Sequence, residues 1–106
     1  MSKAKLLRQI LGPLLEDYHY WFERCRRFLQ EETLDFISPE VQQSLLERVL
    51  AAQAELQAAE ALYRLSDNEV GIDPALMAKW HRLLMECAEL GRCFRQLHPS
   101  SDSSDS

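Results

Sequence analysis

The fold of this chain is decided by residues 73–97, which read DPALMAKWHRLLMECAELGRCFRQL. The apolar residues of this stretch recur in steps of four and three, a spacing that aligns side chains along one face of an α-helix. They are Leu76, Trp80, Leu83, Cys87, Leu90, Phe94 and Leu97. Asp73 and Pro74 form a start signal, because aspartate caps free backbone amides and proline suits the first helical position. The stretch therefore predicts a helix over residues 74–97.

A second helix is predicted over residues 39–65. Ser38 and Pro39 repeat the start signal, and Glu40 suits the positive end of the helix dipole. The main apolar stripe comprises Val41, Leu45, Val49, Ala52, Leu56, Ala59 and Tyr63. Polar residues that begin at Ser66 then predict a loop before the next helix.

A further helix is predicted over residues 3–34. Its stripe comprises Leu7, Leu11, Leu14, Tyr18, Trp21, Cys25 and Phe28, and Leu15, Phe22 and Leu29 widen it. Gly12 and Pro13 interrupt this pattern. Because proline removes a backbone donor and collides with the preceding turn, we expect a kink there or a short separate N-terminal helix.

These patterns predict an all-α fold. We expect one domain over residues 1–98, an antiparallel three-helix bundle with coiled-coil-like packing. The alternative is a long helical hairpin that completes its core by dimerising. Residues 99–106 contain serine and aspartate without an apolar side chain after Pro99, so we expect a disordered acidic tail.

Composition excludes several classes of function. The net charge of -5 over 106 residues opposes binding to nucleic acid and to anionic bilayers. No stretch approaches the roughly 20 apolar residues of a membrane span, so we expect no integral membrane segment. The cysteines Cys25, Cys87 and Cys93 cannot all pair within one chain, which favours a reducing cytoplasm. Cys25 and Cys87 lie on core stripes, where we expect raised thiol pKa values.

Candidate catalytic and metal-binding residues do not form convincing sets. Glu16 and His19 have the spacing found in di-iron bundles, but His81 and His98 lack the matching acid three residues before them. His81, Cys87 and Cys93 are six residues apart, which rotates them around the helix. We therefore expect no enzyme activity, no cofactor and no bound metal.

Two features point instead to protein contacts. Tyr20 falls near the face opposite Tyr18, Trp21 and Phe22, which we assign to the core, and exposed tyrosines beside arginines are common at interfaces. Opposite the main stripe of residues 39–65 lies a second line, which we call the back seam. The back seam comprises Leu50, Ala54, Ala58, Ala61 and Leu65, with Ala51 beside it. It is either a run of good helix formers or a close-approach surface for another helix.

Three segments carry a family resemblance: residues 20–24 (YWFER), 71–73 (GID) and 80–83 (WHRL), the last followed by Glu86 and Cys87. Their order and spacing resemble a cyanobacterial family of short helical proteins catalogued as domain of unknown function 2605. The chain departs from that pattern at Lys79, where the family has a proline. The resemblance covers most of the chain except its tail. It implies a cyanobacterial source and a cytoplasmic or thylakoid-adjacent setting, and it transfers no functional residues.

The sequence thus favours a small non-enzymatic helical adaptor or assembly factor that binds another protein or forms a homodimer. One alternative is a metal- or cofactor-binding bundle that uses His19 and nearby carboxylates. The other is a peripheral membrane protein that inserts residues 6–15.

Overall fold

The computed structural model describes residues 3–67 and 71–98. Within these residues the chain forms three helices and no strand: α1 (Lys3–Glu31), α2 (Pro39–Leu65) and α3 (Pro74–Leu97). The predicted all-α three-helix bundle is therefore confirmed. The predicted acidic tail, part of the predicted second loop and the side chain of Leu7 lie outside the described part of the chain.

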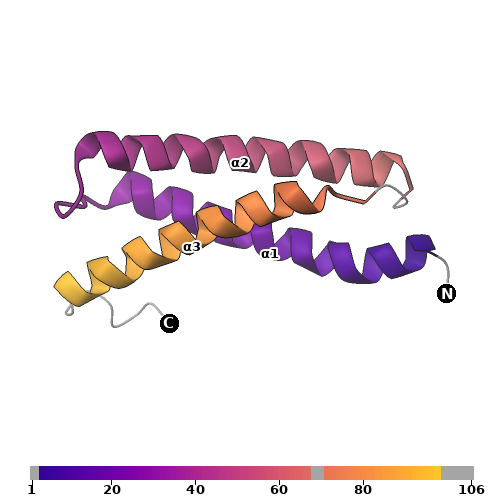
Figure 1. Cartoon of the computed structure of the whole chain (residues 1–106), viewed down its shortest axis with the longest axis horizontal. Helices are drawn as coiled ribbons and strands as arrows, with labels where there is room; N and C mark the ends of the chain where they lie inside the picture. Colours follow the sequence, from indigo (N-terminus) through magenta and orange to yellow (C-terminus); the bar gives the residue numbers. More distant parts are fainter. Residues whose placement is uncertain (1–2, 68–70, 99–106) are drawn as a thin grey trace.

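The helices form an elongated bundle (Figure 1). α1 and α2 run antiparallel to each other, and α3 runs back across α1 at an oblique angle. α1 packs against both other helices. The oblique crossing means that α3 covers only part of α1, and this determines which α1 side chains are buried.

The start signals form the predicted caps. The Ser38 hydroxyl oxygen accepts a hydrogen bond from the Val41 amide at 3.1 Å. The Asp73 carboxylate accepts one from the Ala75 amide at 2.9 Å. Both prolines occupy the first turn, where no backbone donor is needed.

α1 runs unbroken through Pro13, so of the two predicted outcomes the separate N-terminal helix is wrong, and the kink stays a prediction. The buried Leu11 and Leu15 hold the chain on both sides. α1 also ends at Glu31 rather than near Leu34. The Gln42 amide reaches back from α2 and donates to two carbonyl oxygens near the end of α1, at 2.8 and 2.9 Å. This contact satisfies terminal carbonyls and stops the helix.

The core is centred on Trp80 of α3, which is fully buried together with Phe22, Val49 and Leu56. The Trp80 indole donates a hydrogen bond to Glu55 Oε1 at 3.1 Å. The Tyr18 ring meets the Trp80 ring edge-on, with centroids 5.3 Å apart. The core residue Trp80 therefore lies where α1, α2 and α3 meet.

Ion pairs join α3 to α2 around this core. Lys79 Nζ lies 3.0 Å from the second oxygen of Glu55. The Arg48 guanidinium donates to both oxygens of Glu86, at 2.7 and 3.2 Å. The α2–α3 contact is thus closed by paired charges.

The buried face of α1 is rotated from its predicted centre. It comprises Leu11, Leu15, Tyr18, Phe22 and Leu29, whereas Trp21 is 48% exposed. The assignment of Trp21 to the core is therefore wrong, because α3 crosses too obliquely to cover this side of α1. Val41 and Leu97 are also exposed, at 53% and 57%, because they lie in the first and last turns of their helices, where packing ends.

Candidate functional site

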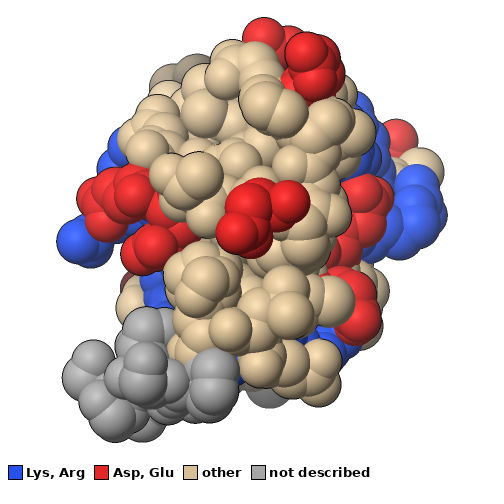
Figure 2. All heavy atoms as spheres, turned by 90° about the vertical axis from the view of Figure 1, so that its left-hand side faces the viewer, with Lys and Arg blue, Asp and Glu red and all other residues tan. Residues whose placement is uncertain are grey.

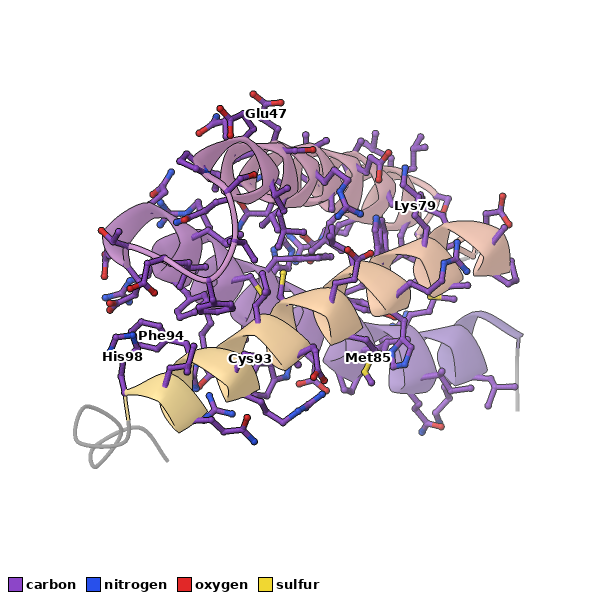
Figure 3. The ribbon with its side chains drawn as sticks, turned by 60° about the vertical axis from the view of Figure 1, so that its left-hand side comes forward. Glu47, Lys79, Met85, Cys93, Phe94 and His98 are labelled. Carbon is purple, nitrogen blue, oxygen red and sulfur yellow. The ribbon has the colours of Figure 1, made fainter. Side chains whose placement is uncertain are left out.

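A groove of about 660 Å³ lies between α1 and α3. Its apolar lining comprises Leu14, Tyr18, Trp21, Cys25 and Phe28 of α1, and Leu84, Met85, Cys87, Ala88 and Phe94 of α3. Figure 3 shows Met85 and Phe94 on the part of α3 that is turned toward α1. Met85 is 52% exposed, so the groove presents large apolar side chains to solvent. A volume of this size is typical of binding sites.

Charged residues line the edges of the groove. Asp17 and Arg24 belong to α1 and Glu32 directly follows its end, while Arg92 and Arg95 belong to α3. Arg92 also forms an ion pair with Glu89 of its own helix. The groove therefore has an apolar floor between edges that carry both signs of charge.

An aromatic cluster stands at the rim of the groove on α1. Tyr20 and Trp21 are 54% and 48% exposed, and their rings meet edge-on with centroids 5.0 Å apart. The Arg24 guanidinium carbon lies 5.8 Å from the Tyr20 ring centroid and 5.5 Å from that of Trp21. Arg24 also donates a hydrogen bond to the Tyr20 hydroxyl at 3.2 Å. The predicted exposure of Tyr20 is confirmed, and Trp21 joins it.

Two thiols meet at the floor of the groove. Cys25 of α1 is half-buried, Cys87 of α3 is buried, and both thiols line the groove. The neighbouring Cys87 thiol lowers the pKa of Cys25, and the charge of Arg24 lowers it further against the opposing effect of burial. The neighbouring Cys25 thiol and burial raise the pKa of Cys87. The expected core position of Cys87 and its raised pKa are confirmed, but the expectation of a raised pKa is wrong for Cys25.

The groove continues toward the end of the molecule that holds the α1–α2 loop. The Phe28 and Phe94 rings meet edge-on with centroids 5.4 Å apart. The Phe94 ring also packs on the His98 ring, with centroids 4.5 Å apart. Figure 2 looks at this end and shows mostly uncharged atoms, with one acidic group near the middle and other charges around the margin. The ring contacts of Phe28, Phe94 and His98 thus extend from the groove toward this end.

The back seam lies on the exposed side of α2. All five of its residues are exposed, including Leu50 at 42% and Leu65 at 83%. Leu62, which the sequence pattern did not single out, is 62% exposed beside Leu65 and Ala61. The seam therefore stays accessible along the C-terminal half of α2 and is separate from the Tyr20 cluster.

The predicted metal ligands do not assemble. His19 pairs with Glu60 of α2 at 2.9 Å, and Glu60 also binds Arg64 at 3.0 Å. Among the described residues no group of three or more histidine, cysteine or acidic side chains could hold a metal ion. His81 and Cys87 both line the groove, but Cys87 has Cys25 as its partner.

The N-terminal segment divides between two environments. Leu11 and Leu15 belong to the core, while Leu6 and Ile10 are 47% and 55% exposed. Insertion of the whole segment 6–15 into a bilayer would therefore require the bundle to open. No helix in the described ranges is long and apolar enough to cross a membrane.

The groove was missed by sequence reasoning, because both of its walls were assigned to the core. One sequence signal could have indicated it. Ala88 and Gly91, which line the groove, place small residues on α3 between Met85 and Phe94 and leave space beside α1.

Comparisons with known proteins give one match. No curated protein and no solved structure matches the chain. Residues 1–96 match a family described as "Protein of unknown function (DUF2605)". This match covers α1, α2 and all of α3 except Leu97. The chain belongs to this family of proteins of unknown function.

Proposed function

We propose that the protein is a non-enzymatic adaptor or assembly factor that binds an amphipathic helix of a partner protein in the α1–α3 groove. The observation that carries this proposal is the exposed Tyr20–Trp21–Arg24 cluster at the rim of an apolar groove. Tyrosine, tryptophan and arginine contribute most of the binding energy at many protein interfaces. Here they are already oriented by contacts with one another, so binding would order few new side chains.

The chemistry of the groove favours a helix as its occupant. An amphipathic helix presents apolar side chains on one face, which would contact Trp21, Met85 and Phe94. Its flanking residues would meet Asp17, Arg24 and Glu32 on one edge and the arginines of α3 on the other. A partner helix with acidic residues on the flank that faces α3, and residues of both signs on the flank that faces α1, has the complementary charge pattern.

Titratable groups outside the groove support a non-enzymatic role. Glu23 and Arg26 shift each other's pKa through their ion pair on α1, and Arg48 and Glu86 do so between helices. Such shifts arise in structural ion pairs as well as in catalytic sites, and these pairs lie away from the groove.

The back seam supports a homodimer as part of the same proposal. An antiparallel pairing about a two-fold axis near Ala58 would set Leu50 of one copy against Leu65 of the other. Ala54 of one copy would then face Ala61 of the other, so the seam is complementary to itself. Self-complementarity of this kind is what a two-fold interface requires. Small residues at the centre would let the helix axes approach closely.

The cytoplasm is the proposed location. An odd number of cysteines, with one low-pKa thiol among them, suits a reducing compartment. The cyanobacterial source implied by the sequence resemblance belongs to this proposal as well.

The experiment is affinity capture from a cyanobacterial extract with tagged full-length protein and three variants. Met85→Glu adds a charge to the groove, Trp21→Ala removes the rim aromatic, and Val41→Glu is the matched control. Val41 is as exposed as Met85 but does not line the groove. We expect one prey protein to be lost from both groove variants, with at least tenfold less recovered, and kept by Val41→Glu. Equal recovery by all four proteins would contradict the proposal.

A further inference from the structure

Cys25 and Cys87 are two thiols that α1 and α3 bring to one groove. They come from different helices, both line the groove, and each shifts the pKa of the other. Cys25 is half-buried while Cys87 is 5% exposed. Cys25 is therefore the thiol that an oxidant in the groove can reach, whereas Cys87 is shielded by burial.

The two thiols have unequal chemistry. The neighbouring Cys87 thiol, and then the charge of Arg24, lower the pKa of Cys25. The neighbouring Cys25 thiol, burial and the negative charge of Glu86 raise the pKa of Cys87. The thiolate is the form that attacks oxidants, so Cys25 is the more reactive member. A partly exposed thiol of lowered pKa beside a second thiol is the arrangement found in redox-sensing cysteines.

We propose that Cys25 and Cys87 are a reversible redox site, in which a hydroperoxide oxidises the pair to a disulfide that joins α3 to α1 at the floor of the groove. The Cys25 thiolate attacks one peroxide oxygen, the O–O bond breaks, and the other oxygen leaves as hydroxide, which takes up a proton to become water. Cys25 is then a sulfenic acid. The Cys87 sulfur attacks the Cys25 sulfur as the Cys87 proton passes to the sulfenic oxygen, the S–O bond breaks, and that oxygen leaves as a second water. Two thiols and one peroxide thus give one disulfide and two waters.

The reverse step needs a dithiol reductant, which returns both thiols by exchange through a mixed disulfide. Oxidation has a mechanical consequence, because α3 is otherwise held to α1 by packing across an open groove. The crosslink fixes the spacing of the two groove walls. It also closes a long loop that contains all of α2, and such loops give disulfides their largest stabilising effect.

The chain offers a clean assay for this site. Trypsin cleaves after Arg24, Arg26, Arg82 and Arg92, so it places Cys25 in residues 25–26, Cys87 in residues 83–92 and Cys93 in residues 93–95. Reduced full-length protein is treated with one equivalent of hydrogen peroxide, alkylated, digested and analysed by mass spectrometry. We expect the 25–26 and 83–92 peptides to be disulfide-linked and the 93–95 peptide to be alkylated. The oxidised protein should melt on the order of 10 °C higher than the reduced protein.

Variants make the result decisive. Cys93→Ser should retain the crosslink, and Cys25→Ser should abolish it. Cys87→Ala tests the order of attack and keeps a small apolar side chain in the core. Because Arg24 is then the only group that lowers the pKa of Cys25, the thiol should react more slowly and stop at a sulfenic acid, which a dimedone probe labels. Circular dichroism confirms that each variant is folded. Crosslinks that include Cys93, crosslinks between chains, or full alkylation of Cys25 and Cys87 after peroxide treatment would overturn the proposal. The assay uses no protein partner, so its outcome is independent of the proposed adaptor role.

Discussion

The two tryptophans lie in two regions of the bundle that differ in whether other helices cover them. Trp80 and Trp21 both lie on apolar stripes with the same four-and-three spacing. Trp80 is fully buried where all three helices meet, while Trp21 is 48% exposed at the rim of the α1–α3 groove. Spacing therefore identifies which side chains share a helix face. Whether another helix covers that face depends on how the helices cross.

The contrast extends to the groups around each tryptophan. Trp80 has an aromatic neighbour, and its indole donates to a carboxylate that also binds Lys79. Trp21 has exposed neighbours, Tyr20 and Arg24. The first set stabilises the fold, whereas the second set remains accessible to a partner. We therefore expect substitutions in the two regions to have different effects on stability and binding.

The largest effect should follow from Trp80→Ala. Removing a fully buried aromatic leaves a cavity and takes one hydrogen-bond donor from the Glu55 carboxylate, so we expect a loss of about 3–5 kcal/mol in the free energy of unfolding. Urea denaturation followed by circular dichroism measures this loss. A loss below about 1 kcal/mol would mean that Trp80 is not the centre of the core.

Glu55→Gln should have a smaller and pH-dependent effect. The hydrogen bond from Lys79, and then that from Trp80, lower the pKa of Glu55 below its ordinary value of 4.5. A lowered folded-state pKa gives stability that is complete above the ordinary value and is lost as the pH falls through the folded-state pKa. At pH 7 we expect the variant to be about 1 kcal/mol less stable.

The difference in melting temperature between wild type and Glu55→Gln should therefore shrink as the pH falls below 4.5. Melting curves of both proteins, recorded about every half pH unit between pH 3 and pH 7, would show how this difference changes. A difference that stays constant down to pH 3 would show that the Glu55 charge does not stabilise the fold.

The sequence predicted what depends on local contacts. The starts of α2 and α3 were predictable because Ser38 and Asp73 cap amides only a few residues away. The end of α1 was not, because it depends on the side chain of Gln42 reaching back from the next helix. The pairing of Cys25 with Cys87 was equally beyond the sequence, because it depends on how α3 crosses α1.

The site was predictable to the same extent. The exposure of Tyr20 and of the back seam followed from helical geometry alone, because each lies opposite an apolar stripe. The groove could not be predicted from helical geometry alone. Its residues share the periodicity of a core, and only the oblique path of α3 leaves them partly uncovered.

Trp21→Ala should change stability by less than about 1 kcal/mol, since the side chain is already half in water. Fluorescence then separates the two regions, because each tryptophan can be observed alone. In the Trp21→Ala variant, which retains only Trp80, acrylamide should quench the tryptophan fluorescence weakly. In a Trp80→Phe variant, which retains only Trp21, acrylamide should quench the fluorescence several-fold more strongly. Equal quenching of the two would erase the distinction between core and rim.

The smallest effect on stability should come from Ala58→Glu, which changes the centre of the back seam. Ala58 is exposed, and glutamate is a good helix former, so we expect a change within about 0.5 kcal/mol in an isolated chain. In a dimer paired through the seam, two glutamates would face each other across the two-fold axis. Their bulk and like charge should shift the light-scattering mass toward the monomer without loss of helicity.

Ala78→Glu is the matched control, since it makes the same exchange at an exposed alanine of α3 and gives the same net charge. It should leave the mass unchanged, so a shift seen only with Ala58→Glu would assign self-association to the seam. A wild-type protein that is monomeric at high concentration would remove the homodimer from the proposed function and leave the groove as the surface for a foreign partner. Unfolding by Ala58→Glu would contradict the exposure of the seam itself, because an exposed face of α2 has no packing for the glutamate to disrupt.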